Sequence, residues 1–196
     1  MTDDLRQRFP DYDDYLIHIS KLGTKRFLEG IAKMDLMEPI VEVGAMSLVG
    51  GCAKVFEKHP ETYVDSRKLF AGKQYLSMDI DPAGGADITG DFMDAVSVLG
   101  KQSVGSLIMV SVLDHLPFWD TPAIIADILK SGGRAYLRTS WNFRLHGPRP
   151  LIGYPCDDGY RLLFGREPFV IESLQKIECP GRPLAPVGFT VVVKRD

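Results

Sequence analysis

Short apolar segments alternate along this chain with segments of helical periodicity, and this alternation limits the fold more than any other feature. The longest apolar segment, Val104–Val110, is almost uninterrupted, which is typical of a central parallel strand buried on both faces. Helical patterns joined to such strands by short connections predict right-handed parallel crossovers. We therefore expect an α/β fold with a doubly wound, mostly parallel sheet. Its first five strands are expected at residues 40–43, 75–78, a very short stretch within 83–91, 104–110 and 134–139.

The two ends of the chain add elements outside this alternation. Residues 12–22 and 24–34 place apolar side chains three and four positions apart, which predicts two helices, the second capped by Thr24. We expect them to form an N-terminal helical cap (residues 1–36) over a sheet edge or a pocket. Residues 171–178 and 188–194 are expected to pair as a C-terminal antiparallel hairpin. The 196 residues fit a single domain, 1–196.

Composition excludes several classes of protein. Apolar residues make up 45% of the chain, which favours a folded globule over disorder. With 23 basic and 26 acidic side chains, a nucleic-acid partner is not expected. Three dispersed cysteines without a C-x-x-C pair favour a reducing, cytoplasmic location. Neither a secretory signal nor a membrane-spanning run is visible, so no membrane partner is expected.

The strand-to-helix turn within residues 39–51, P-I-V-E-V-G-A-M-S-L-V-G-G, is the first candidate binding element. Glycine permits positive φ and close approach of a ligand to the backbone, and helix-start N–H groups favour anionic or polar ligand groups. The alternative is a tight turn of the kind found in any α/β protein. Parallel sheets bind ligands at the carboxyl ends of their strands.

The segments that follow, in order and spacing, resemble the class I S-adenosylmethionine-dependent methyltransferases over roughly residues 39–178. The matching pieces are V-E-V-G-A-M-S-L-V-G-G, Y-L-S-M-D-I-D-P, A-D-I-T-G-D-F, V-S-V-L-D-H-L-P and I-L-K-S-G-G-R-A-Y-L-R-T-S. The chain is most similar to the methyltransferase type 11-like subgroup, whose first motif has a single glycine and whose fifth strand is followed by an H-G…P-x-D-x-Y-x-R tail. The resemblance implies a Rossmann-like fold and S-adenosyl-L-methionine as cofactor.

The resemblance also implies cofactor-binding roles. Glu42 and Gly44 would lie beside the methionine part, with the backbone from Gly44 onward facing its amino and carboxylate groups. Asp79 would accept both ribose hydroxyls, since one carboxylate can take two O–H donors. The full implied set is Glu42, Gly44, Ala45, Met46, Asp79, Ile80, which would pack on the adenine, and Asp91, which would accept from the adenine amino group.

Simpler interpretations of the same residues stay open. Asp79 and Asp81 could be solvated turn acids before Pro82. Asp91 could cap the helix expected from residue 92, and His115 could be a histidine at the edge of the core, bonded to a backbone carbonyl.

Catalysis of methyl transfer needs few side chains, because the cofactor carries the chemistry. For a hydroxyl or protonated amine acceptor, His115 or His146 is the candidate general base, and Asp114 would orient the histidine or the acceptor. No metal is expected. Residues 141–165 are rich in aromatics, proline and glycine and are interpreted as a substrate lid, with Arg144, Tyr160 and Arg161 binding a small-molecule or glycan acceptor. Alternatively, the lid aromatics only close the core.

Three rival functions remain. Ala45 and Met46 stand where small or polar residues are usual, so a catalytically degenerate module that binds a cofactor or a protein partner is the main alternative. A nicotinamide-dependent oxidoreductase would need G-x-G-x-x-G and an acid about 20 residues on, which residues 44–79 do not provide. Metal-dependent hydrolysis by Asp114, His115, His146 and Asp157 lacks a recognisable ligand spacing.

Overall fold

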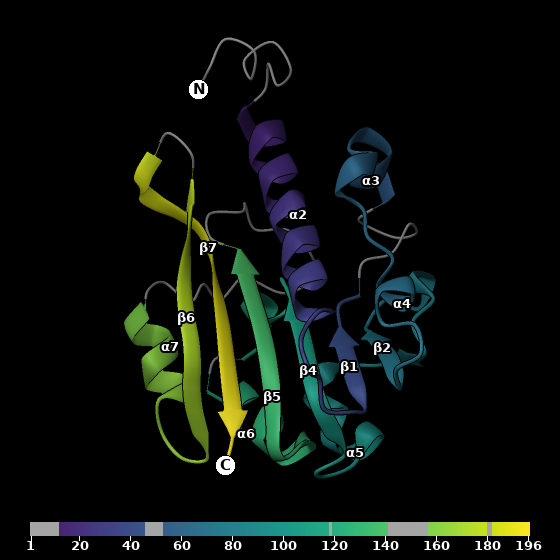
Figure 1. Cartoon of the computed structure of the whole chain (residues 1–196), viewed down its shortest axis with the longest axis vertical. Helices are drawn as coiled ribbons and strands as arrows, with labels where there is room; N and C mark the ends of the chain where they lie inside the picture. Colours follow the sequence, from purple (N-terminus) through teal and green to yellow (C-terminus); the bar gives the residue numbers. More distant parts are fainter. Residues whose placement is uncertain (1–11, 46–52, 118, 141–156, 180–181) are drawn as a thin grey trace.

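The structure of the chain is a computed structural model, which describes residues 12–45, 53–117, 119–140, 157–179 and 182–196. A seven-stranded sheet runs through the molecule, with α2 lying across one of its faces (Figure 1). Among the residues described, no helix is both long enough and apolar enough to cross a membrane.

The elements follow one another in the alternation that the sequence predicts. The α-helices are α2 (Tyr12–Ile31), α3 (Ala53–Lys58), α4 (Ser66–Leu69), α5 (Ala95–Leu99), α6 (Thr121–Ile128) and α7 (Asp157–Phe164). The strands are β1 (Ile40–Val43), β2 (Tyr75–Asp79), β3 (Ile88–Thr89), β4 (Val104–Val110), β5 (Leu129–Ser140), β6 (Phe169–Cys179) and β7 (Arg182–Arg195). Short 3₁₀ turns lie between them: η2 (Pro60–Thr62), η3 (Pro82–Gly84), η4 (Phe92–Asp94) and η5 (Leu113–His115).

The strand order is β3-β2-β1-β4-β5-β7-β6. Strands β1 to β5 pair with one another in parallel, and β7 pairs antiparallel with both β5 and β6. The predicted doubly wound, mostly parallel sheet with a C-terminal antiparallel hairpin is therefore confirmed. The hairpin is not a simple edge extension, because β7 inserts between β5 and β6.

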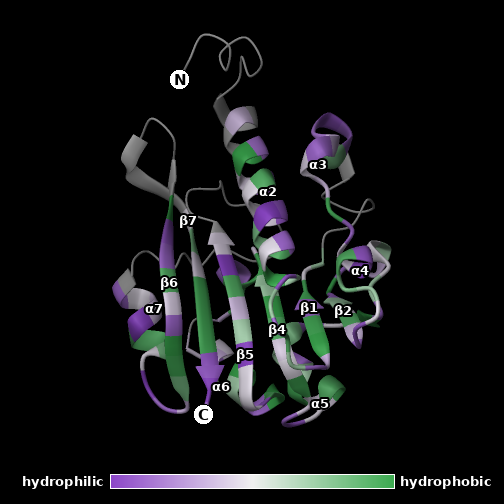
Figure 2. Ribbon diagram, viewed as in Figure 1, coloured by the Kyte–Doolittle hydropathy of each residue, from purple (hydrophilic) through white to green (hydrophobic). Residues whose placement is uncertain are grey.

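Each strand of the sheet centre buries its side chains alternately on two faces. On one face Ile40, Ile108 and Tyr136 pack against the apolar residues of α2, including Leu28 and Ile31. The other face packs against α5, α6 and α7. All seven residues of β4 are buried, as its apolar run predicts. Figure 2 shows hydrophobic residues along β1 and β7, and mixed hydropathy along α2, which has one face on the sheet.

The N-terminal prediction was wrong in one respect, because α2 is a single helix of 20 residues. The sequence suggested a break at Gly23 and a cap at Thr24. In the structure Thr24 is buried in mid-helix, and its Oγ1 accepts a hydrogen bond from Nε of Arg138 at 3.3 Å. A Cβ at Gly23 would lie 2.5 Å from a guanidinium nitrogen of Arg138, so this glycine makes room for a side chain of β5. The helix covers a face of the sheet rather than its edge.

One further expectation about local structure needs correction. Residues 157–164, expected to belong to the lid segment 141–165, form α7, while residues 141–156 lie outside the described residues. At the start of α6, Thr121 is the first helical residue after the N-cap Asp120, and its hydroxyl donates to the carbonyl of Pro117 at 2.7 Å.

Candidate functional site

The segments that leave β1, β2 and β4 meet at the carboxyl edge of the sheet, because these three strands are adjacent and parallel. Backbone hydrogen bonds tie the segments together. The N–H of Gly44 donates to the carbonyl of Met78, and the N–H of Gly90 donates to that of Asp79, each at 2.9 Å. Side chains that are far apart in sequence are thus held close together at one edge.

Gly44 is required at the end of β1 for two independent reasons. Its φ is +71°, in the left-handed region that L-residues with a Cβ rarely adopt. In addition, a Cβ there would lie 2.2 Å from Cγ2 of Val112, in the segment after β4. The left-handed glycine agrees with the sequence prediction, and the group that approaches it closely is a valine side chain.

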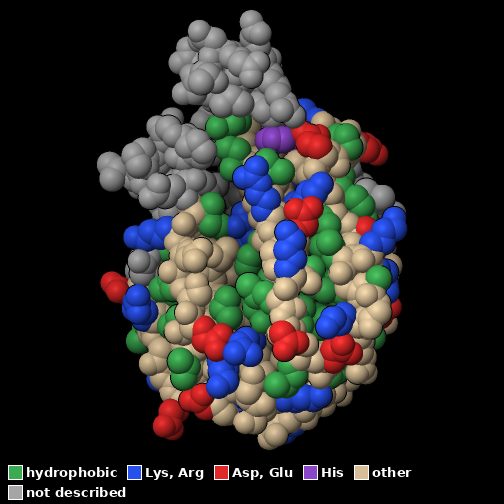
Figure 3. Space-filling view, in the orientation of Figure 1, with side chains coloured by type: hydrophobic (Ala, Val, Ile, Leu, Met, Phe, Trp, Pro, Cys, Tyr) green, Lys and Arg blue, Asp and Glu red, His purple; other side chains and the backbone are tan. Residues whose placement is uncertain are grey.

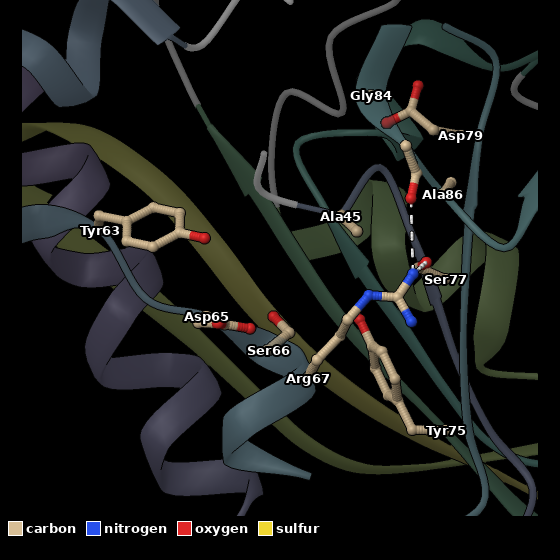
Figure 4. A pocket seen from close by; sticks show the side chains of 11 residues that line it. Ala45, Tyr63, Asp65, Ser66, Arg67, Tyr75, Ser77, Asp79, Gly84 and Ala86 are labelled. Carbon is tan, nitrogen blue, oxygen red and sulfur yellow. Dashed lines mark hydrogen bonds between the residues drawn. The ribbon is translucent and has the colours of Figure 1, made fainter. Parts of the chain in front are cut away.

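A pocket of about 210 Å³ lies beside this turn (Figure 4). Its lining includes Asp79 at the end of β2, Ala45 after β1, and Ser66 and Arg67 from α4. Oδ1 of Asp79 accepts the N–H of Asp81 at 2.9 Å, and no other described residue donates to that carboxylate. Asp79 therefore shapes its own turn and also borders a pocket.

The side chain of Glu42 has no exposed surface and contacts Tyr75, a residue that lines the pocket. Its Oε2 accepts a hydrogen bond of 2.7 Å from the hydroxyl of Tyr75. Within the described part of the chain, neither Oε1 of Glu42 nor the hydroxyl of Ser66 has a hydrogen-bond partner. Burial raises the pKa of Glu42, and the hydroxyls of Tyr75 and Ser66 offset part of that rise. Buried polar atoms are usually hydrogen-bonded, so Oε1 of Glu42 is available to a donor from outside the described residues.

A second polar group at the pocket is satisfied within the protein. The guanidinium of Arg67 pairs with the carboxylate of Asp87 at 3.0 Å and donates to the hydroxyl of Ser77 at 3.1 Å. Asp87 also accepts the N–H and the hydroxyl of Ser77, at 2.8 and 2.9 Å. Burial raises the pKa of Asp87, but the donors from Ser77 and Arg67 outweigh it, so the net effect is a lowered pKa. Local sequence patterns do not reveal this network, because Arg67 and Asp87 come together only in the folded chain.

The end of β4 carries the predicted catalytic pair. Asp114 is buried and His115 is half-buried, both in η5. Just before them Ser111 has a φ of +54°, an uncommon conformation for a residue with a side chain. Left-handed residues outside glycine often mark functional turns, a signal that the sequence does not carry.

The residues expected around the adenine differ in their surroundings. Ile80 follows Asp79 and is 55% exposed, so an apolar face is available next to the pocket. Oδ1 of Asp91 accepts the N–H of Met93 at 3.0 Å and caps η4. The capping role that the sequence left open is therefore present, and the adenine contact stays a prediction.

The predicted substrate residues do not come together in the described structure. Tyr160 is fully buried on α7, with its hydroxyl hydrogen-bonded to that of Thr139, whereas Arg161 is exposed. Met46, Arg144 and His146 lie outside the described residues.

Known structures resemble the whole chain. A Haloferax volcanii protein assigned as a methyltransferase, solved in complex with a methyltransferase activator, superposes with a TM-score of 0.60 over 94% of this chain and 97% of its own, at 16% identity. A geranyl diphosphate C-methyltransferase from Streptomyces coelicolor A3(2), solved with Mg²⁺, geranyl diphosphate and S-adenosyl-L-homocysteine, gives 0.59 over 89% and 77%, at 11% identity. An S-adenosylmethionine-dependent methyltransferase from Archaeoglobus fulgidus gives 0.53 over 97% and 98%, at 10% identity.

This chain has the methyltransferase fold. No protein-family model and no curated protein sequence matches it, so the likeness lies in the structure and not in the sequence. At identities of 10–16% it extends to the fold alone.

The residues at the carboxyl edge of the sheet fit S-adenosylmethionine. The methionine end of this cofactor carries an ammonium group, and its ribose carries two hydroxyls. Both the ammonium and the hydroxyls need hydrogen-bond acceptors on the protein. Glu42 offers a buried carboxylate oxygen without a donor, and Asp79 offers a carboxylate at the pocket. Both positions belong to the set that the family resemblance assigns to the cofactor.

Proposed function

We propose that this chain is an S-adenosylmethionine-dependent methyltransferase that methylates oxygen or nitrogen of a small-molecule or glycan acceptor. The observation that carries the proposal is a pair of carboxylates at the carboxyl edge of the sheet. Asp79 lines the pocket, and the buried Glu42 is hydrogen-bonded to the lining residue Tyr75 and has one oxygen without a partner among the described residues. A buried acceptor of this kind costs stability unless a ligand supplies a donor.

In this proposal the cofactor lies across the ends of β1 and β2. Oε1 of Glu42 accepts from the ammonium of the methionine end, while the backbone at Gly44 and Ala45 lines its path. Asp79 accepts from the ribose hydroxyls, Ile80 covers one face of the adenine, and Asp91 accepts from the adenine amino group. Met46, in the same turn, is assigned to the cofactor by the resemblance.

When bound, the cofactor supplies an electrophilic methyl group on a sulfonium. The protein must then align the acceptor atom and exclude water. His115 at the end of β4, or His146, removes the proton from the acceptor hydroxyl or ammonium. Asp114, which precedes His115 in the sequence, is buried, and we assign it to hold the histidine or the acceptor in place.

The acceptor would lie beyond the carboxyl ends of β4 and β5. Tyr160 is bonded to Thr139 within the core, so its contribution is to support the wall of the acceptor site. Arg161 is exposed on α7, and it is assigned with Arg144 to pair with an acidic group of the acceptor.

The first experiment measures binding of S-adenosyl-L-homocysteine by calorimetry and thermal shift. At 100 times its dissociation constant the ligand should stabilise the chain by about 2.7 kcal/mol. Asp79→Asn should weaken binding by about 10- to 100-fold, because hydrogen bonds to a charged acceptor contribute about 1.5–3 kcal/mol. Asp94→Asn is the matched control, since Asp94 is exposed and its side chain caps nothing. Equal affinity in the Asp79 and Asp94 variants would contradict the placement of the ribose.

The second experiment measures turnover as S-adenosyl-L-homocysteine released in the presence of hydroxyl and amine acceptors. His115→Ala and His146→Ala should each retain cofactor affinity. The variant that removes the base should turn over about 10²- to 10⁴-fold more slowly. If both variants keep the parental rate, neither histidine acts as a base.

A module that keeps the fold without turnover is the second candidate. Ala45 and Met46 in the glycine turn favour it, and the Haloferax volcanii neighbour was solved with an activator protein, so a protein partner is a reasonable ligand for such a module. Binding of S-adenosyl-L-homocysteine that depends on Asp79, together with release of product in any acceptor assay, decides for the enzyme. Cofactor binding without release of product, or no cofactor binding at all, decides for the module.

A further inference from the structure

Two buried histidines and a glutamate meet at the end of the molecule where α2 and α3 lie. His18 belongs to α2, His59 directly follows α3, and Glu61 lies in η2. One ligand-type atom from each of the three side chains lies within 4.8 Å of the other two. Figure 3 shows a histidine side chain beside an acidic one at the surface of this end of the molecule. None of the three residues lines the pocket at the carboxyl edge.

The distances suit a bound transition-metal ion. A tetrahedral Zn²⁺ with bonds of roughly 2.0–2.1 Å holds its ligand atoms about 3.3 Å apart. Nδ1 of His18 and Oε1 of Glu61 are 3.3 Å apart, so one edge of such a tetrahedron is already formed. The rings of His18 and His59 meet edge to face, with centroids 5.2 Å apart. The ligand nitrogen of His59 lies within 4.8 Å of both of these atoms, which places it near a third corner.

Burial and backbone structure hold the three groups in place. His18 and His59 are each 7% exposed, and the side chain of Glu61 is 44% exposed. The turn that carries two of the ligands is fixed by the Thr62 hydroxyl, which donates to the carbonyl of His59 at 2.7 Å. It is also fixed by Nζ of Lys25, which donates to the carbonyl of Glu61 at 3.0 Å. The exposed glutamate leaves a side open for entry of an ion and for a water as fourth ligand.

We propose that His18, His59 and Glu61 bind a divalent transition-metal cation of the zinc type. Two imidazoles and a carboxylate are a donor set preferred by such ions over Mg²⁺ or Ca²⁺, which favour oxygen ligands. The ion would join α2 to the segment after α3. Because α3 starts at Ala53, directly after the glycine turn, the metal would anchor the helix that follows this turn. This assignment does not depend on methyl transfer.

The test uses the full chain without an affinity tag, freed of metal by a chelator and then titrated with Zn²⁺ against a chromophoric competitor. Cys52, Cys156 and Cys179 are replaced by serine in every protein, because free thiolates bind zinc. The cysteine-free chain should bind one equivalent. His59→Asn and Glu61→Gln should each weaken binding by more than the roughly 10- to 100-fold caused by loss of an outer-shell partner.

Glu57→Gln is the matched control, because it removes an exposed carboxylate of α3 close to the site in sequence without touching the three ligands. It should bind Zn²⁺ like the parent. Thermal unfolding gives the second readout, with Zn²⁺ raising the midpoint of the parent and the control but not of His59→Asn. Should His59→Asn fail to fold, Glu61→Gln decides, since its side chain is partly exposed. Unchanged zinc affinity in Glu61→Gln, or no binding by the cysteine-free parent, overturns the proposal.

Discussion

Replacing Gly44 by alanine tests the geometry on which the candidate site depends. The substitution places a Cβ in a backbone conformation with φ of +71° and 2.2 Å from Cγ2 of Val112. The first effect costs about 1–2 kcal/mol, and overpacking of a well-packed site costs about 1–3 kcal/mol. Gly44→Ala should therefore lower the free energy of unfolding by about 2–5 kcal/mol.

The two contributions can be separated by a double-mutant cycle. In the Val112→Ala background the new methyl meets no Cγ2, and the Cβ of residue 112, 3.8 Å away, is at ordinary contact distance. Gly44→Ala should then cost only the backbone contribution. Gly72→Ala supplies the same contribution without a clash, because Gly72 has a φ of +83° and no heavy atom within 4 Å of the added Cβ.

Urea denaturation followed by circular dichroism measures all variants, with the free energy of unfolding extrapolated to water. The expected coupling energy between positions 44 and 112 is about 1–3 kcal/mol. If Gly44→Ala lowers the free energy of unfolding equally with valine and with alanine at position 112, the segments that carry residues 44 and 112 do not approach each other closely. If it costs no more than Gly72→Ala in the parent background, the packing argument fails in the same way.

Three further substitutions test single residues. Burial raises the pKa of Glu42 above 4.5, so above pH 4.5 the folded chain binds more protons than the unfolded chain, and stability is lost as the pH rises through the folded pKa. Glu42→Gln should flatten this pH dependence and raise the free energy of unfolding at neutral pH, measured in urea titrations. A steeper fall of stability with pH in this variant would contradict the argument. Tyr160→Phe leaves the buried hydroxyl of Thr139 without this partner and should lower the free energy of unfolding by about 1–3 kcal/mol in the same assay. An unchanged urea midpoint would show that this hydrogen bond contributes nothing to stability. Asp91→Ser keeps an acceptor for the N–H of Met93, so stability should stay within about 0.5 kcal/mol of the parent; weaker binding of S-adenosyl-L-homocysteine would then report an adenine contact, and unchanged affinity would leave only the cap.

The parallel part of the fold could be predicted because its signals are local. A strand buried on both faces needs apolar residues at nearly every position, and Val104–Val110 has them. The break predicted at Gly23 failed for the opposite reason. The helix continues through Gly23, where the absent side chain leaves space for Arg138 of β5. Arg138 lies 114 positions beyond its partner Thr24, and no local sequence pattern reports so distant a contact.

At the candidate site, too, residue positions next to strands could be predicted from local sequence, whereas contacts between distant residues could not. Gly44 and Asp79 stand directly at the ends of strands, so a strand prediction also places them. The contacts of Tyr75 with Glu42 and of Arg67 with Asp87 depend on which strands are neighbours and on which face each residue occupies. These pairings become visible only when the sheet has been assembled.

The balance of donors and acceptors at the pocket also separates the methyltransferase proposal from a nicotinamide-dependent enzyme. Arg67 is the one lysine or arginine that lines the described pocket, and Asp87 and Ser77 already engage it. A pyrophosphate would need donors or free positive charge there. The charged groups left over are carboxylates, that of Asp79 in the lining and that of Glu42, which is hydrogen-bonded to the lining residue Tyr75. They suit a ligand that brings an ammonium group and hydroxyls. The local chemistry of the pocket, independently of the fold, therefore favours a cofactor with its positive charge near β1 and a ribose near β2.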